Sequence, residues 1–228
     1  MKTSPLPRSP KSLVAAGALA AVLVATAAAQ DSQDSQHSND PRLARLDPAA
    51  RSLVVVVIDS ARTAGLPTEP LVQRALEGAT KGAPGTLIGN AVRRLAADLG
   101  RARAALGAGA TPPELEAGAA ALRAGAGPAV LAQLRRSPRQ TITVPLAVLT
   151  DLVASGVPVD SAAAAVLALA ASSGDADLID FRRAVERDIA LGAAPTAATA
   201  GAAAGFLAAG ADAVHVNAGA RDARPGRP

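Results

Sequence analysis

Glycines and prolines divide this chain into short segments, and they stand where helices start and stop. Residues 65–84 read GLPTEPLVQRALEGATKGAP. Gly65 can adopt the left-handed backbone conformation that ends a helix, and Pro67 cannot continue that helix. Gly82 and Pro84 repeat the pattern. A phosphate-binding loop needs Gly-Lys followed by Ser or Thr, whereas the order here is Lys-Gly, so we interpret the stretch as a helix and its two boundaries.

The preceding segment contains the run VVVVI at residues 54–58, which by itself is typical of a buried strand. Asp47 supplies an N-cap acceptor, Pro48 suits the first helical turn, and Gly65 closes the segment. We therefore predict a helix from Pro48 to just before Gly65, with a strand at 53–58 as the alternative. Five apolar residues share one face of this helix: Leu53, Val54, Val57, Ile58 and Ala61.

Similar boundaries frame the helices that we predict further along the chain. A helix over about residues 84–106 has an apolar stripe, and Thr111 with Glu114 forms a capping box for a helix that ends near Ala124. Shorter helices are expected at 128–136 and 145–154. The stripe of the longest helix consists of Ile88, Val92, Leu95, Leu99, Ala102 and Leu106.

The same order of signals recurs 91 residues later. The tripeptide GLP at 65–67 aligns with GVP at 156–158, and Leu-Ile at 87–88 then aligns with Leu-Ile at 178–179 without a gap. A weaker match begins at Gly109. Because a single helical hairpin cannot bury its apolar face alone, such repeats stack on one another. We predict an all-α fold, an irregular helical bundle or short solenoid of about nine short helices in degenerate helical hairpins.

The N-terminal region has the three parts of a secretory signal. Three basic residues precede the apolar run at 13–25, and three alanines precede Gln30. We therefore expect residues 1–29 to be a signal peptide that is cleaved, which leaves a periplasmic or secreted protein without a membrane span. The alternative is an uncleaved membrane anchor over residues 13–29.

Composition divides the rest of the chain into three parts. Residues 30–46 are polar and rich in Ser, Gln and Asp, so we expect a flexible linker. The helical domain is expected over residues 47–209. The last residues, 210–228, are interpreted as a second flexible tail.

Charge and composition argue against several classes of function. The chain has 23 Lys and Arg against 19 Asp and Glu, but three of those basic residues and no acidic residue lie in residues 1–29, so the mature charge is +1. With only two phenylalanines as aromatic residues, the chain also lacks the rings that stack on bases, and we expect no nucleic-acid partner. It contains no cysteine, which excludes disulfides and thiol chemistry.

An acidic cluster, GDADLID at residues 174–180, resembles part of a calcium loop. Asp175 and Asp177 have the required spacing, and Glu186 occupies the twelfth position. Ile179 offers no ligand at the fifth position, however, and Asp180 replaces the glycine that the loop requires. We therefore reject these residues as a metal site and expect Asp175 to cap a helix.

The pattern GLPTEP…EGATKGAP resembles uncharacterised exported, alanine-rich helical proteins of high-GC bacteria, over about residues 48–208. The resemblance implies no activity and no functional residue. The two histidines, His37 and His215, are far apart in the expected terminal regions and form no metal or acid–base site.

We therefore expect an exported, non-enzymatic helical domain that requires no cofactor. It would be a structural or protein-interaction module of the cell envelope, and its partner is an unknown protein or envelope component. The alternative is a small-molecule-binding protein or hydrolytic enzyme whose carboxylates and arginines are brought together by folding. The candidate residues for that site are Asp59, Arg74, Glu77, Arg93 and Asp98.

We predict that the exported protein begins at Gln30, because the small residues before it are typical of a signal-peptidase site. N-terminal sequencing of protein recovered outside the cytoplasm measures this directly. Recovery of a membrane-associated form that retains Met1 would contradict the prediction and support the anchor.

Overall fold

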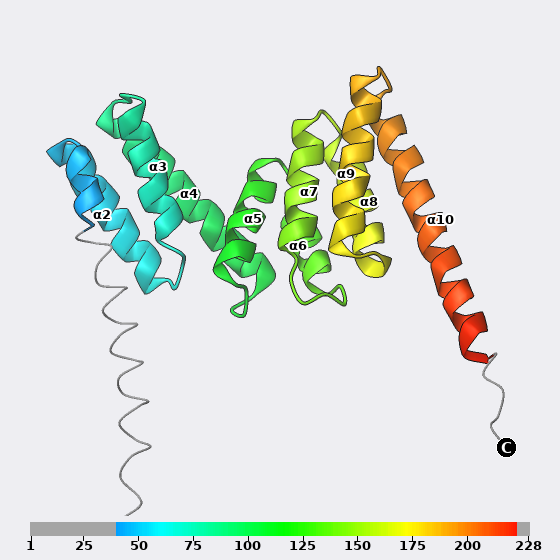
Figure 1. Cartoon of the computed structure of the whole chain (residues 1–228). Helices are drawn as coiled ribbons and strands as arrows, with labels where there is room; N and C mark the ends of the chain where they lie inside the picture. The colour runs from blue at the N-terminus through cyan, green and yellow to red at the C-terminus, as the bar shows by residue number, and fades with distance from the viewer. Residues whose placement is uncertain (1–39, 223–228) are drawn as a thin grey trace, which may run out of the picture.

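The computed structural model describes the backbone of residues 40–222 and the side chains of residues 40–209. Within residues 40–222 every regular element is helical, which confirms the all-α prediction (Figure 1). A 3₁₀ helix, η1, precedes nine α-helices. Their bounds are η1 Pro41–Arg45, α2 Pro48–Thr63, α3 Glu69–Thr80, α4 Gly85–Leu106, α5 Pro112–Arg123, α6 Pro128–Arg135, α7 Thr143–Ala154, α8 Val159–Ser172, α9 Asp175–Ala190 and α10 Pro195–Asp222.

The helices form two layers in which chain order alternates. In one layer α2 packs on α4, α4 on α6, α6 on α8 and α8 on α10. In the other, α5 packs on α7 and α7 on α9, while α3 packs against α4. Figure 1 shows the resulting row of helices, with α2 and α10 at opposite ends. Each helix contacts mainly its neighbours in the row, as expected of a short irregular solenoid.

The interior between the layers is built mostly from leucine, valine and alanine. Phe181 is its largest fully buried side chain. Small residues let the helices approach closely, and Gly118 of α5 is an example between three helices. A Cβ atom at Gly118 would lie 3.1 Å from Leu106, 3.2 Å from Ala102 and 3.3 Å from Leu131. A larger side chain at Gly118 would therefore require these neighbours of α4 and α6 to shift by a few tenths of an ångström.

The expected helix boundaries are largely confirmed. Asp47 caps α2 by accepting a hydrogen bond of 2.9 Å from the Ala50 amide. The VVVVI run is helical, so the strand alternative is wrong. Gly65 and Gly82 have the positive φ angles, 66° and 64°, that the sequence pattern requires. Leu53 is an exception, because its side chain is 42% exposed and only its inner edge packs against Gly89 of α4.

Both expected domain boundaries need correction. The linker at 30–46 is wrong over its last residues, because η1 is ordered there and buries Leu43 and Leu46 against the helical domain. Residues 30–39 lie outside the described chain. The tail at 210–228 is wrong in its first part, since α10 continues to Asp222 without a Gly-Pro boundary. The remaining residues, 223–228, are also outside the described part.

The predicted repeat is present in the spacing of the helix starts but not in the packing, because α3 packs closely along α4 whereas α8 and α9 hardly touch. Helices α3 and α4 correspond to α8 and α9, but both pairs start 90 residues apart instead of 91. The reason is local. Thr68 separates Pro67 from α3, whereas Pro158 itself is the N-cap of α8. Consequently Leu178 matches the buried Ile88, and Leu87, its expected equivalent, is exposed.

The carboxylate of Glu114 joins three helices. At 1% exposure, Glu114 is the most deeply buried charged residue among the described side chains. One carboxylate oxygen accepts from the Thr111 amide at 2.9 Å and so completes the capping box of α5. The other accepts from Arg135 Nη1 at 3.1 Å and from the Ile142 amide at 3.3 Å. Burial opposes ionisation, but these hydrogen bonds and the charge of Arg135 hold the pKa of Glu114 below its ordinary value.

None of the helices within residues 40–222 is long and apolar enough to cross a bilayer.

We predict that Glu114→Gln lowers the free energy of unfolding at neutral pH by about 1–3 kcal/mol, because the neutral amide leaves donors of the buried network poorly satisfied. The pKa of Glu114 is depressed in the folded state, so its contribution is present above the ordinary value of 4.5 and is lost as pH falls through the folded value. Urea unfolding of both proteins at several pH values should show the difference shrinking in acid.

Glu116→Gln is the matched control, two residues further along α5 and on its exposed side. Burial and the nearby charge of Glu69 raise the pKa of Glu116, so its ionisation does not favour the folded state, and we expect no loss of stability at neutral pH. A Glu114→Gln deficit that stays constant from neutral to acid pH would contradict an electrostatic role.

Candidate functional site

A groove opens where the second layer is interrupted. Among the described helices, each one packs closely on the next helix of its layer, with one exception. In the second layer, α3 and α5 do not pack along each other. Both pack against α4, and they come together near their N-termini, where Pro67 and Pro112 line one small depression. Further along, the two helices leave the middle of α4 uncovered between them. Two adjoining depressions of about 610 and 580 Å³ occupy this space and share Arg74, Leu95 and Arg123.

The half of the groove over α4 is basic. Asp98 is the buried centre of this half, with 6% exposure. Arg101 pairs with one of its oxygens at 2.6 Å, and Arg123 of α5 approaches the other at 3.9 Å. Arg94 lies on the same face of α4, and its side chain forms no ion pair or hydrogen bond within the described residues. One carboxylate thus faces three guanidinium groups, which leaves this half with positive charge.

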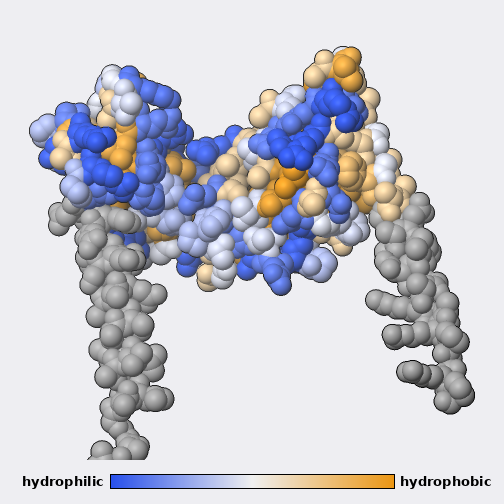
Figure 2. All heavy atoms as spheres, viewed as in Figure 1, coloured by the Kyte–Doolittle hydropathy of each residue, from blue (hydrophilic) through white to orange (hydrophobic). Residues whose placement is uncertain are grey.

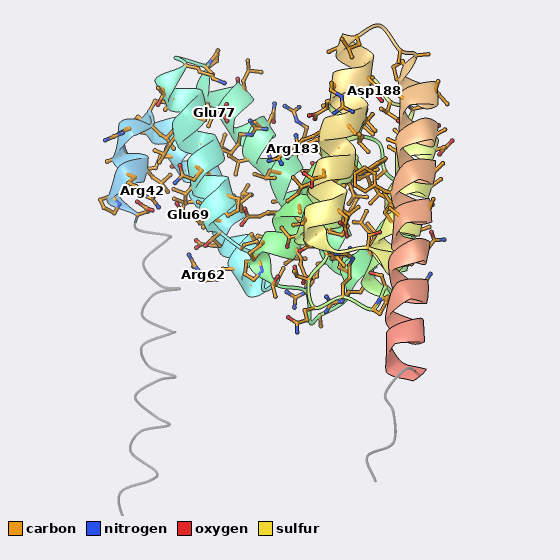
Figure 3. All side chains as sticks on the ribbon, turned by 45° about the vertical axis from the view of Figure 1, so that its right-hand side comes forward. Arg42, Arg62, Glu69, Glu77, Arg183 and Asp188 are labelled. Carbon is orange, nitrogen blue, oxygen red and sulfur yellow. The ribbon has the colours of Figure 1, made fainter. Side chains whose placement is uncertain are left out.

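The half between α3 and α5 is acidic. Glu69 lies at the start of α3 and binds Arg42 through two hydrogen bonds of 3.0 and 2.8 Å; both residues are labelled in Figure 3. Glu116 lines the same depression from α5 and is close enough to Glu69 to be affected by its charge. The Glu116 side chain has no hydrogen-bond or ion-pair partner among residues 40–209. Its carboxylate is therefore available to a positively charged group of a ligand.

Arg74 and Glu77 line the α3 wall between these two halves. Arg74 Nη1 lies 2.9 Å from Glu77 Oε2, and Lys81 contacts the other carboxylate oxygen. These hydrogen bonds, that from Lys81 foremost, lower the pKa of Glu77. Leu95 provides an apolar floor at 9% exposure. The groove thus offers an apolar strip with a free guanidinium towards one end and a free carboxylate towards the other.

The groove contains only part of the catalytic or ligand-binding site that the sequence suggested. Arg74, Glu77 and Asp98 line it, although neither depression contains all three. Asp59 instead pairs with Arg62 at 2.8 Å on α2. Arg93 points to the other side of α4, where it lines a separate depression beside α2. Folding therefore assembles three of the five candidates.

Five charged groove residues were missed: Glu69, Arg94, Arg101, Glu116 and Arg123. A signal for two of them existed in the sequence. Arg94, Asp98 and Arg101 are spaced by four and three residues, so they form a polar stripe beside the apolar stripe of α4. No comparable pattern identifies Glu116 or Arg123, because only the packing of α5 on α4 brings them to the groove.

The rejected calcium residues are held by other interactions. Asp175 pairs with Arg139, Asp177 accepts from the Gly174 amide at 2.8 Å, and Glu186 pairs with Arg182. The prediction that Asp175 caps a helix is wrong, because Gly174 is the N-cap of α9. Asp177 takes the capping role from the third helical position. No group of three potential metal ligands occurs among the described side chains.

Comparison of the chain with protein-family models, curated proteins and solved structures found no match.

We predict that calcium leaves the melting temperature nearly unchanged, because a ligand stabilises a protein only through affinity for its folded form. Asp177→Asn keeps an oxygen acceptor for the Gly174 amide and should be nearly neutral. Asp175→Ala removes the partner of Arg139, whose side chain is only 10% exposed, and should cost about 1 kcal/mol. Thermal melts of the three proteins with calcium and with chelator test this. A large calcium-dependent rise that both substitutions abolish would show a metal site.

Proposed function

We propose that this chain is an exported helical-repeat module of the cell envelope that binds an extended segment of another protein in the groove between α3 and α5. The observation that carries the proposal is the uncovered middle of α4, which places Arg94 and Glu116, two charges without partners in the described chain, in one groove with Leu95 between the two helices. Helical-repeat proteins commonly bind partners on such continuous surfaces.

The charge arrangement favours a partner segment with complementary polarity. An acidic side chain or carboxy terminus of the partner would meet Arg94 and Arg123, and a basic side chain would meet Glu116. An apolar side chain between them would cover Leu95. Opposite charges at the two ends fix the direction of the bound segment, since the reversed orientation places like charges together.

The residues that line the groove support a binding role over a catalytic one. The two depressions are lined by guanidinium, carboxylate, amide and apolar side chains, without a hydroxyl, imidazole or amine group. Nucleophilic catalysis by serine, threonine, lysine or histidine needs such a group beside a base. The buried carboxylate of Asp98 already pairs with Arg101, so we assign Asp98 the role of positioning that arginine.

The proposed location is the periplasm or the exterior of the cell. It is supported by the charged, apolar and small-residue parts of residues 1–29 and by the polar composition that follows them. A partner in the envelope would then be accessible to the groove.

A small-molecule site is the second candidate, and Glu116 favours it. Burial and the charge of Glu69 raise the pKa of this carboxyl, as is common for groups that bind or transfer protons in ligand sites. A zwitterionic compound with an amine and an acid group would satisfy the same two unpaired charges.

We predict that a displayed library of random peptides yields binders with an acidic residue towards one end and a basic residue towards the other. Arg94→Glu should raise their dissociation constants about tenfold or more, because it reverses the charge that receives the acidic residue. Arg136→Glu is the matched control. This exposed arginine also has no side-chain partner within the described residues and follows α6, away from the groove.

Binding that both substitutions weaken equally would show general electrostatic attraction and contradict the groove. If no peptide binds but a small zwitterion raises the melting temperature of the wild type and not of Arg94→Glu, the second candidate is correct. Isothermal titration with the selected peptides provides the affinities.

A further inference from the structure

The last helix leaves an unusually apolar end on the row of helices. On its inner side α10 packs against α8 and α9. The sequence contains no charged residue between Asp188 and Asp212, a stretch that includes the α9–α10 turn and all described side chains of α10. Leu191 is 80% exposed and Leu207 37%. Figure 2 shows the outer side of this end coloured mostly from white to orange.

The opposite end of the row is partly protected, although Leu53 and Val56 of α2 are 42% and 68% exposed. There η1 packs on α3, and the Arg51 side chain of α2 donates hydrogen bonds to the Leu43 and Leu46 carbonyl groups. Terminal repeats of solenoids normally carry a polar outer face that prevents further stacking. The α10 end lacks this protection within its described side chains.

A shallow groove of about 350 Å³ lies along the seam between α9 and α10. Phe206 forms part of its wall and packs edge-to-face on the buried Phe181, with ring centroids 6.2 Å apart. Gly201 and Gly205 also line it, and a Cβ atom built at either glycine meets no atom within 4 Å. The surface beside α10 is thus open enough to admit another helix.

The rim of this groove carries one charge of each sign. Arg187 and Asp188 of α9 are adjacent, and their side chains lie 3.4 Å apart at 67% and 40% exposure (Asp188 is labelled in Figure 3). If a twofold axis passed through the groove, Arg187 of one copy would face Asp188 of the other, and Asp188 would face Arg187. The rim is therefore complementary to itself.

We propose that a second copy of this chain covers this face, with α10 of each copy packed in the α9–α10 groove of the other. The twofold arrangement buries Leu207 and the glycine-lined side of α10, and it forms two Arg187–Asp188 pairs between the copies. The interface is remote from the α3–α5 groove and leaves that groove free for a partner.

The chemistry of the face favours a second copy over a lipid surface. Alanine and glycine bury little apolar area in a bilayer, so they provide weak membrane affinity, whereas they let two helices approach closely. Membrane-surface helices also carry a basic border, and here the positive charge of Arg187 is balanced by Asp188.

Analytical ultracentrifugation of the protein recovered after expression of the full-length chain tests the proposal. We expect a concentration-dependent dimer for the wild type and at least a tenfold higher dissociation constant for Gly205→Glu, which places a charge in the contact. The substitution suits the isolated fold because the space at Gly205 is open. Gly100→Glu is the matched control, since Gly100 lies within α4 and has equally open space. It should dimerise like the wild type.

The rim pairs are tested by charge reversal. Arg187→Glu and Asp188→Arg should each weaken the dimer, and the double variant R187E/D188R should restore it, because opposite charges face each other again across the axis. A wild type that stays monomeric up to about 100 μM, well above the usual range of specific dimers, would overturn the proposal. So would a dimer that Gly205→Glu leaves intact, or single reversals that the double variant does not rescue.

Discussion

The buried carboxylate of Glu114 is the interaction on which the middle of this fold depends. It completes the N-terminus of α5, receives Arg135 from the end of α6, and accepts the amide of Ile142, the residue before α7. An ionised group at 1% exposure is costly unless its hydrogen bonds are satisfied. Because the partners come from three successive segments, the carboxylate fixes how α5, α6 and α7 meet, and so connects the α2–α4 end of the row to the α8–α10 end.

The position of α5 decides where the surface can bind a partner. Gly118 lets α5 pack closely on α4 and α6, because a Cβ atom there would already press on Ala102 and Leu106. In this position α5 cannot also pack along α3, and the middle of α4 stays uncovered. The groove is therefore a consequence of core packing. Its charges follow the same geometry: α5 brings Arg123 to Asp98 and Glu116 to the neighbourhood of Glu69.

The two proposed surfaces differ in the physics that defines them. The α3–α5 groove presents charges without internal partners, so recognition there depends on complementary polarity and direction. The α9–α10 face is apolar and formed by small residues, with Arg187 and Asp188 at its rim. Association through this face depends on two helices approaching closely. A second copy related by a twofold axis presents the same surface and therefore the matching shape. One chain can therefore carry a partner in its groove while it self-associates through its end.

The sequence by itself determined the helices, because their signals act within one or two turns. Asp47, Thr111 and Glu114 mark helix starts, Gly65 and Gly82 mark ends, and the periodic stripe of α4 identifies its buried face. Only the tertiary structure decided which polar residues meet. Asp175 was expected to cap a helix and instead pairs with Arg139, 36 residues away. Such contacts depend on the angles and offsets between packed helices. Side chains throughout the core set these angles together through their volumes, so no local sequence pattern encodes them.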